Sequence, residues 1–154
     1  MFKEMRKKER QLASEEVIEN LNKGEYGVLA TVNDDGYPYS IPLSYVYHKG
    51  NIYFHCAIEG QKLNNIKRNS KVSFCITTDT EILPSQFSTK YKSVVIFGNA
   101  EEVFEVEKEE ALLALIEKYS GEFLEQGKKY ISAAKDKTKV IRIKINHISG
   151  KGRK

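Results

Sequence analysis

The residues best suited to chemistry lie in one short segment, 53–66, whose pattern predicts a strand, a turn and the start of a helix. Gly60 falls in the turn, and Lys62 falls in the first helical turn. Backbone N–H groups at a helix start have no intrahelical partner, and the helix dipole favours negative charge there. The spacing therefore predicts an anion site, in which Lys62 supplies a charge and Gln61 a hydrogen bond. The alternative is an ordinary connection with an exposed lysine.

The histidines and Ser44 give weaker indications of a functional site. His55, at the end of the expected strand, is either a ligand-bonding side chain or a strand-end histidine bonded to the backbone. His48 and His147 fall in a turn and near the C-terminus, and the three histidines are too scattered for a metal triad. Ser44 has no base paired with it in the sequence, so a nucleophilic role is not expected. His55 is therefore the one candidate for a catalytic role, and no metal site is expected.

Six strand-like segments position these residues. The second contains Pro38 at its start and Pro42 inside it, and because proline cannot donate to a ladder this strand is expected at an edge or with a bulge. Gly98 is expected to bend or bulge the fifth strand. The six segments are residues 26–32, 39–47, 52–57, 72–77, 93–106 and 140–148.

Helices are expected at the start of the chain and late in it. The first begins at Ser14 as N-cap and ends at Gly24, and the next covers residues 60–69. Residues 107–136 form a helical insertion before the last strand, whereas residues 79–92 have no clear period and predict a long loop or short helical turn. Strands joined by hairpins, with helices that do not alternate with them, predict an antiparallel barrel with added helices.

Length and composition favour one ordinary globular domain. A chain of 154 residues, with 40% hydrophobic and 30% charged residues, predicts a single domain over 1–154 with residues 1–10 as a basic arm. No apolar run approaches a membrane span, and no apolar segment follows the charged N-terminus as a signal peptide requires, so a cytoplasmic protein without membrane contact is expected. Cys56 and Cys75 fall inside strands and are expected to be buried free thiols.

Positive charge gathers at the two ends of a chain whose net charge is +4. Basic ends usually remain solvated and sometimes contact nucleic acid. No nucleic-acid motif accompanies them, so nucleic-acid binding ranks last among the functions considered. A modestly positive surface also favours an anionic ligand.

Several motifs, in the same order along the chain, resemble those of the pyridoxamine 5′-phosphate oxidase-like flavoproteins. Within that superfamily the chain most resembles the branch of nitroimidazole-resistance (NimA-type) proteins. The matching segments are GEYGVLAT at 24–31, DGYPYSIPLSY at 35–45, FHCA at 54–57, GQKL at 60–63, KVSFC at 71–75, YKSVVIFG at 91–98 and HISGK at 147–151.

This resemblance implies a six-stranded split β-barrel that forms a homodimer, with FMN in a groove between the subunits. The phosphate-binding turn falls on His55, Gly60, Gln61 and Lys62. The oxidases proper carry an arginine where Gln61 stands and basic residues where Ser40 and Ser44 stand, which argues against oxidation of pyridoxamine phosphate. The remaining cofactor contacts implied by the resemblance are Tyr39, Ser40, Ile41, Pro42, Leu43 and Ser93.

Two main functions follow from the resemblance. In the first, FMN accepts hydride from a nicotinamide donor and reduces a small electrophile such as a nitro compound, with Tyr39, Pro42 and Tyr45 lining the groove for the flavin ring. In the second, the chain is a flavin- or haem-binding module without turnover, with His55 and His147 as the haem ligands to consider. Fold alone does not separate the two.

Overall fold

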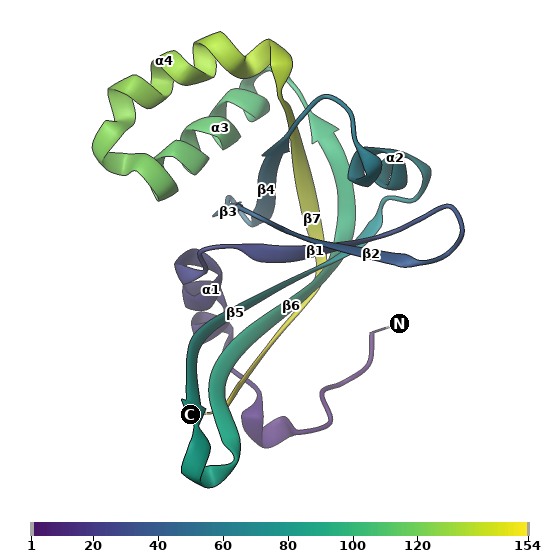
Figure 1. The fold of residues 1–154 in the computed structure, drawn as a ribbon, viewed down its shortest axis with the longest axis vertical. Helices are drawn as coiled ribbons and strands as arrows, with labels where there is room; N and C mark the ends of the chain where they lie inside the picture. The colour runs from purple at the N-terminus through teal and green to yellow at the C-terminus, as the bar shows by residue number, and fades with distance from the viewer. Residues whose placement is uncertain (1, 154) are drawn as a thin grey trace.

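The computed structural model describes residues 2–153, and its centre is one antiparallel sheet of seven strands (Figure 1). In spatial order the strands run β2-β1-β5-β6-β7-β4-β3, and every neighbouring pair is antiparallel. The strands are β1 (Gly27–Val32), β2 (Pro38–Leu43), β3 (Val46–His48), β4 (Asn51–Cys56), β5 (Lys71–Leu83), β6 (Ser88–Val103) and β7 (Lys139–Arg153).

The two edges of this sheet are joined by only two residues. β2 ends at Leu43 and β3 begins at Val46, yet these strands are the opposite edges of the sheet. The sheet must therefore curl until its edges meet, which makes an incompletely hydrogen-bonded, split barrel. The expected mainly β fold with added helices is confirmed.

The strand expected over residues 39–47 is in fact two strands. Tyr45 lies at the break, and its backbone N–H donates to the hydroxyl of Tyr119 (3.1 Å) rather than to a neighbouring strand. Its fully buried hydroxyl donates to the carbonyl of Leu21 (2.5 Å). These two contacts turn the chain from one sheet edge to the other, so the count is seven strands instead of six.

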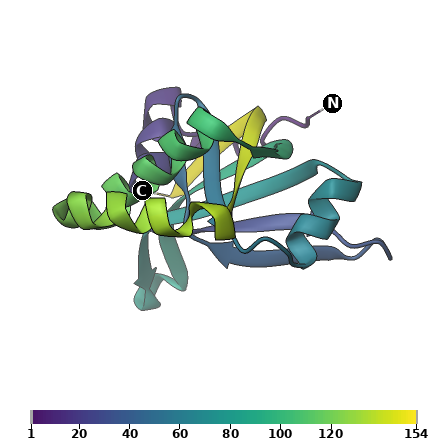
Figure 2. The ribbon, with the colours of Figure 1, turned by 90° about the horizontal axis from the view of Figure 1, so that it is seen from above.

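In the part of the chain that the structure describes, four α-helices surround the barrel: α1 (Ser14–Lys23), α2 (Gln61–Arg68), α3 (Glu105–Ser120) and α4 (Leu124–Ala134). Seen from above, the α3–α4 pair and α2 lie on opposite sides of the molecule (Figure 2). The expectation of Ser14 as N-cap is wrong by one position, because Ala13 is the N-cap and no side chain caps α1. Within residues 2–153 no helix has the length and apolar character to cross a bilayer.

Residues 79–92 form the end of a long hairpin rather than a loop. β5 and β6 stay paired as far as Leu83 and Ser88, and a short 3-10 turn, Pro84–Gln86, joins them. The hairpin extends away from the barrel (Figure 1), so its residues have no buried side and show no alternation; Phe87 is 97% exposed. The expected irregularity at Gly98 is confirmed by a register shift between β6 and β7.

Two apolar clusters form the core. The larger fills the barrel and is built by alternate residues of its strands, among them Leu29, Phe74 and Ile96. The smaller lies between α3 and the outer side of β4, where Tyr53 packs with Ala111. β4 is therefore covered on both faces, by the barrel interior on one and by the helical layer on the other.

Candidate functional site

The start of α2 has the geometry of an anion site. Gly60 precedes the helix with φ +155°, and a Cβ atom placed there would meet nothing within 4 Å. No side chain caps the helix, and the first hydrogen bond across its start is the one from the N–H of Asn64 to the carbonyl of Gly60 (3.1 Å). The half-buried Lys62 has no ion-pair partner among residues 2–153. Open space, free N–H groups and an unpaired cation suit a phosphate group.

Side-chain amides hold α2 in place. Gln61 donates through Nε2 to Oδ1 of Asn33 in the β1–β2 turn (2.8 Å). Asn65, which is buried, donates through Nδ2 to the same oxygen (2.8 Å) and to Oγ1 of Thr31 (3.0 Å). The sequence predicted Gln61 as a phosphate donor, but its N–H group is engaged here in positioning the helix. Asn33 and Asn65 were missed, because nothing in the sequence joins positions so far apart.

The side chains of β2 point alternately to the two sides of the sheet. Ile41 and Leu43 pack against the barrel core, and Tyr39 shares their face, whereas Ser40 and Pro42 are exposed on the outer face. β2 pairs only with β1, which confirms the edge position expected from its prolines. Its other side is free for contacts with a flat ligand along the strand.

Ser93 and Tyr45 lie apart from this strand. Ser93 is on the outer face of β6, opposite Thr77 on β5, so three interstrand steps of about 4.8 Å, roughly 14 Å, separate it from β2. A single chain therefore does not bring Ser93 together with the other predicted residues. Tyr45 is fully buried, so the groove expected from Tyr39, Pro42 and Tyr45 does not form, since the barrel closure occupies the Tyr45 side chain.

On the outer side of the five strands from β2 to β7, charge is absent from the middle and returns beside Ser93, whose lateral neighbour on β7 is Lys151. Phe2 of the N-terminal segment stacks on Phe97 and His147. Two rows of laterally paired residues cross the middle of this side, and their side chains are small or apolar except for one histidine in the second row. Val28 at 36% and Phe97 at 40% exposure are its largest accessible apolar side chains. We call this the outer face; its rows are Pro42, Val28, Cys75, Val95, Ser149 and Ser40, Ala30, Ser73, Phe97, His147.

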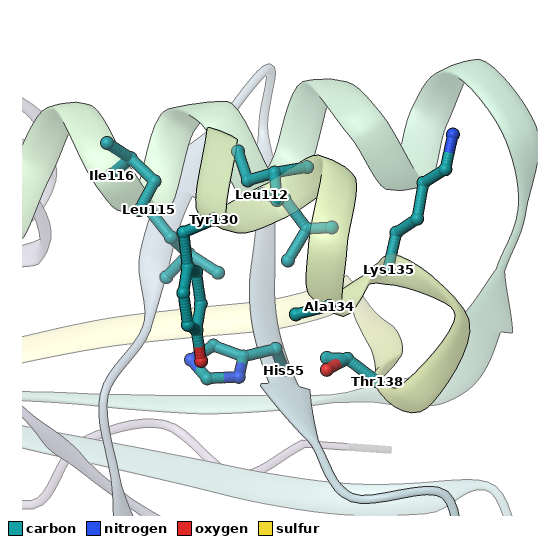
Figure 3. Close-up of a pocket in the computed structure, with 9 residues that line it drawn as sticks. His55, Leu112, Leu115, Ile116, Tyr130, Ala134, Lys135 and Thr138 are labelled. Carbon is teal, nitrogen blue, oxygen red and sulfur yellow. The ribbon is translucent and has the colours of Figure 1, made fainter. Parts of the chain in front are cut away.

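His55 points away from the anion site. It shares the side of β4 that faces the helical layer and lines a cavity beneath α3 and α4 (Figure 3). Partial burial lowers the pKa of this histidine below its ordinary 6.5, so the imidazole is mainly neutral at pH 7. The adjacent Cys56 faces the barrel; burial raises the pKa of its thiol, and the charge of Lys62 partly offsets the effect. His55 and Cys56 therefore lie on opposite sides of the strand, His55 toward the helical layer and Cys56 toward the barrel.

His55 and His147 cannot ligate one haem iron within a single chain. His55 is paired with Val140 on β7, and His147 lies seven residues further along that strand. At about 3.3 Å per residue the two positions are about 23 Å apart along the strand. Two axial ligands must converge on one metal atom, which this separation forbids.

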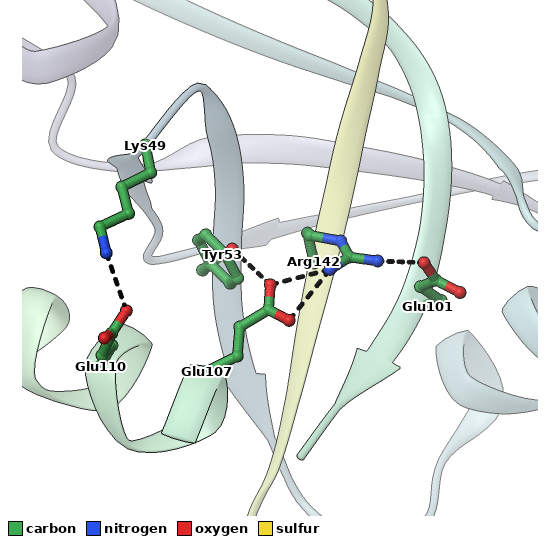
Figure 4. Close-up of polar contacts among 6 residues, drawn as sticks. All are labelled: Lys49, Tyr53, Glu101, Glu107, Glu110 and Arg142. Atoms are coloured by element: carbon green, nitrogen blue, oxygen red, sulfur yellow. Dashed lines mark hydrogen bonds and ion pairs between the residues drawn. The ribbon is translucent and has the colours of Figure 1, made fainter. Parts of the chain in front are cut away.

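Charged side chains fasten the helical layer to the barrel (Figure 4). Glu107, in the first turn of α3, accepts hydrogen bonds from Tyr53 on β4 (2.6 Å) and from Arg142 on β7 (2.8 and 3.0 Å). Arg142 also bonds to Glu101 on β6. The hydrogen bond from Tyr53 lowers the pKa of Glu107, and burial raises that of Tyr53 to about 12. These charges are satisfied within the fold, which indicates a structural role.

Comparison with known proteins places the chain in context. The profile of the family described as pyridoxamine 5′-phosphate oxidase matches residues 13–152. No curated protein matches the sequence.

Solved structures of similar fold share few identical residues with the chain. A candidate 5-nitroimidazole antibiotic resistance protein from Bacteroides thetaiotaomicron has a TM-score of 0.80 at 19% identity, covering 92% of this chain and 86% of its own. An FAD-binding protein from Mesorhizobium loti has a TM-score of 0.68 at 24% identity, covering 94% and 98%. The flavocytochrome Anf3 from Azotobacter vinelandii has a TM-score of 0.82 at 18% identity, covering 98% and 72%.

Proposed function

The chain belongs to the pyridoxamine 5′-phosphate oxidase family, and we propose that it is a flavoprotein that binds FMN between two copies of itself and reduces a small electrophile. The observation that carries the proposal is the start of α2, where an uncapped helix, an open glycine turn and the unpaired Lys62 offer a place for a dianionic phosphate. The FAD-binding protein from Mesorhizobium loti, which has a similar fold, is consistent with a flavin as the ligand.

Each part of the proposed site has a distinct task. Lys62 and the N–H groups of α2 hold the phosphate, and the amides of Asn33, Gln61 and Asn65 fix the helix that presents them. The free side of β2 offers its backbone to the polar edge of the flavin ring. Bound FMN supplies the redox chemistry, so the chain itself needs no nucleophile.

The proposed substrate is not a vitamin B6 phosphate. Recognition of a second phosphate requires further cations, and the exposed positions where the oxidases proper carry them hold Ser40 and Ser44. Gln61 is likewise neutral and already bonded to Asn33. A small electrophile without a phosphate, such as a nitro compound, fits a site with a single unpaired cation.

The outer face is the proposed seam between two copies. In a two-fold symmetric dimer a patch meets its own copy, so any charge on it near the symmetry axis would face a like charge. The ten positions of the outer face hold no Lys, Arg, Asp or Glu, although 30% of the chain is charged. Ser40, Pro42 and Ser93 all lie on this side of the sheet, so a partner copy can bring its Ser93 to the β2 strand of the first.

The absorbance spectrum of the purified protein, with an FMN titration, tests the cofactor. We expect flavin bands and a dissociation constant in the micromolar range or below; a colourless protein that does not bind added FMN would refute the proposal. Oxidation of NADH or NADPH, with and without a nitroaromatic acceptor, then tests turnover.

The seam has its own test. Val28→Arg places a charge on the outer face, between Pro42 and Cys75, and we expect light scattering to show a monomer with weakened FMN binding. Tyr37→Arg, at an exposed position of the β1–β2 turn, is the matched control that keeps the dimer. A Val28→Arg variant that stays dimeric with full FMN content would exclude this face.

A second candidate function is a flavin- or haem-binding module without turnover, favoured by the similarity to the Azotobacter flavocytochrome. Since His55 and His147 cannot meet on one iron within a chain, haem would need one histidine from each chain or a single ligand. A Soret band on haem addition, lost in His55→Ala or in His147→Ala, together with absent NADH or NADPH oxidation, would favour this candidate over the first.

A further inference from the structure

The cavity beneath the helical layer lies outside the proposed cofactor site. Its volume is about 50 Å³ when only positions for the centre of a water molecule are counted, and about 370 Å³ when all space between atoms, including open solvent, is counted. Figure 3 shows it between α3, α4 and the end of β4. Apolar side chains from both helices make most of its wall: Leu112, Leu115, Ile116, Ile131 and Ala134.

Three polar side chains reach this apolar space without a partner. His55, Tyr130 and Thr138 line it, and none of the three forms a hydrogen bond with another residue in the described part of the chain. Their atoms keep some solvent contact through the mouth, since His55 and Tyr130 remain exposed. Water at the mouth can satisfy these groups, and a ligand that enters can replace that water, so three polar side chains on one apolar cavity can hold a small molecule in a fixed orientation.

The residues that line the cavity determine whether a charged or a neutral ligand can bind there. Lys135 is the one charged residue lining the cavity, and Glu109 already pairs with it (3.6 Å). A charged ligand would lose its hydration without a free counter-ion, whereas a neutral ring would bury apolar surface against the leucines and isoleucines. The imidazole of His55, mainly neutral at pH 7, offers one donor and one acceptor. A hydroxyl group on the ring can use either.

We propose that this cavity is a second binding site, for a small neutral hydroxy-aromatic molecule of the phenol class. The ring enters between α3 and α4, and its hydroxyl bonds to His55, with Thr138 and Tyr130 at the rim. The site does not depend on the proposed FMN site, because no residue that lines the cavity belongs to α2 or β2. The helical layer thus has a role beyond covering the barrel.

Phenol itself is the probe, with histidine-ring NMR as the readout on the FMN-loaded protein. We expect millimolar phenol to shift the His55 resonances saturably and to leave those of His48 and His147 unchanged. Toluene, which lacks the hydroxyl, should bind severalfold more weakly, and 4-hydroxybenzoate, which carries a carboxylate, should give no shift. Ala134→Leu fills the cavity and should abolish the phenol shift while the FMN spectrum stays unchanged.

A second variant guards against misfolding of the first. Thr138→Val keeps the shape of the side chain but removes the hydroxyl. It should weaken the binding of phenol severalfold and leave the binding of toluene unchanged. The proposal is overturned if phenol leaves His55 unshifted, if both variants bind phenol like the wild type, or if FMN and phenol compete. The FMN titration is read separately, so failure here leaves the proposed function intact.

Discussion

The α2 turn and the helical layer are two helical regions placed on the same barrel, and Lys62 at the start of α2 differs from the cations at the helical layer in having no partner within the fold. Neutral amides and a hydrogen bond from Arg68 to the carbonyl of Val32 hold α2, whereas Lys62 at its start has no ion-pair partner among the described residues. Where the helical layer meets the barrel, Arg142 of β7 bonds to Glu107 of α3 and to Glu101 of β6, and Lys118 of α3 donates to the carbonyl of Tyr45 (2.9 Å).

This difference separates a binding role from a structural one. A cation with all its partners inside the fold adds to stability and has little left to offer a ligand. A cation without a partner adds little to stability, but it can bind an anion without first breaking a contact. Substitutions in the α2 turn should therefore change ligand affinity, and substitutions in the helical layer should change stability.

Lys62→Ala should give the largest effect and only on binding. Loss of a charge-assisted hydrogen bond costs about 1–3 kcal/mol, so FMN affinity should fall roughly 5- to 150-fold. The free energy of unfolding should change by less than about 0.5 kcal/mol, because Lys62 has no ion pair to lose. Fluorescence titration with FMN and urea denaturation measure the two quantities.

Lys67→Ala is the matched control for Lys62, since Lys67 is exposed in the last turn of the same helix. Both its FMN affinity and its stability should equal those of the wild type. Equal losses of affinity in the two variants would show that general positive charge, rather than the start of α2, attracts the cofactor.

Glu107→Ala should produce the converse result. Tyr53 and Arg142 lose their shared acceptor, and since Glu107 is partly exposed we expect a loss of about 1–2 kcal/mol in the free energy of unfolding, with FMN affinity unchanged. Glu110→Ala, which breaks only the exposed pair with Lys49, should cost less than about 0.5 kcal/mol.

The pH dependence of the Glu107→Ala deficit has a definite sign. The carboxylate of Glu107 has a lowered pKa, so its contribution is present above the ordinary value of 4.5 and is lost as the pH falls through the lower folded value. The deficit of the variant should be full at pH 7 and shrink below pH 4.5. A deficit that persists unchanged at pH 3 would mean that lost packing, not charge, causes it.

The sequence predicted the parts of the fold that depend on local pattern. Alternation marked the buried strands, and the glycine turn with its following helix marked α2. The sequence-based prediction was wrong where contacts between distant residues determine the structure. The break at Tyr45 depends on Tyr119, and the hairpin over residues 79–92 has no buried face to create a pattern. The sequence could not assign the direction of His55, because β4 is covered on both sides and either face would have suited a histidine.

The pH dependence of stability at Lys118 tests the structural role of the helical layer. Burial lowers the pKa of Lys118 to about 8 from an ordinary 10.5, so between these values the unfolded chain binds more protons than the folded one and stability rises with pH. The rise should be about 1 kcal/mol or less, because the side chain is only half-buried and the Tyr45 carbonyl and ring stabilise its ammonium.

The experiment compares wild type with Lys118→Met over pH 7–10. Burial raises the pKa of Tyr45, which faces Lys118, so above pH 10 the unfolded tyrosine ionises first and stability falls again. Tyr119 also faces the ammonium, at 5.0 Å from its ring centre. Taking the difference between the two proteins removes these tyrosine contributions. A difference that stays flat from pH 8 to pH 10 would contradict the lowered pKa.

Gln61→Arg should give the smallest effect, and it adds to the α2 turn the cation that the oxidases proper carry. The new guanidinium lies beside the phosphate at an exposed position, where an ion pair contributes about 0.5 kcal/mol, so FMN should bind about twofold more tightly. The hydrogen bond from Gln61 to Asn33 is lost, but Asn65 still holds that oxygen, so stability should hardly change. Gln61→Met, which loses the same hydrogen bond without adding charge, isolates the electrostatic part. If the arginine and methionine variants bind FMN equally, the phosphate does not lie at the start of α2. The binding role that the comparison assigns to the α2 turn would then be wrong.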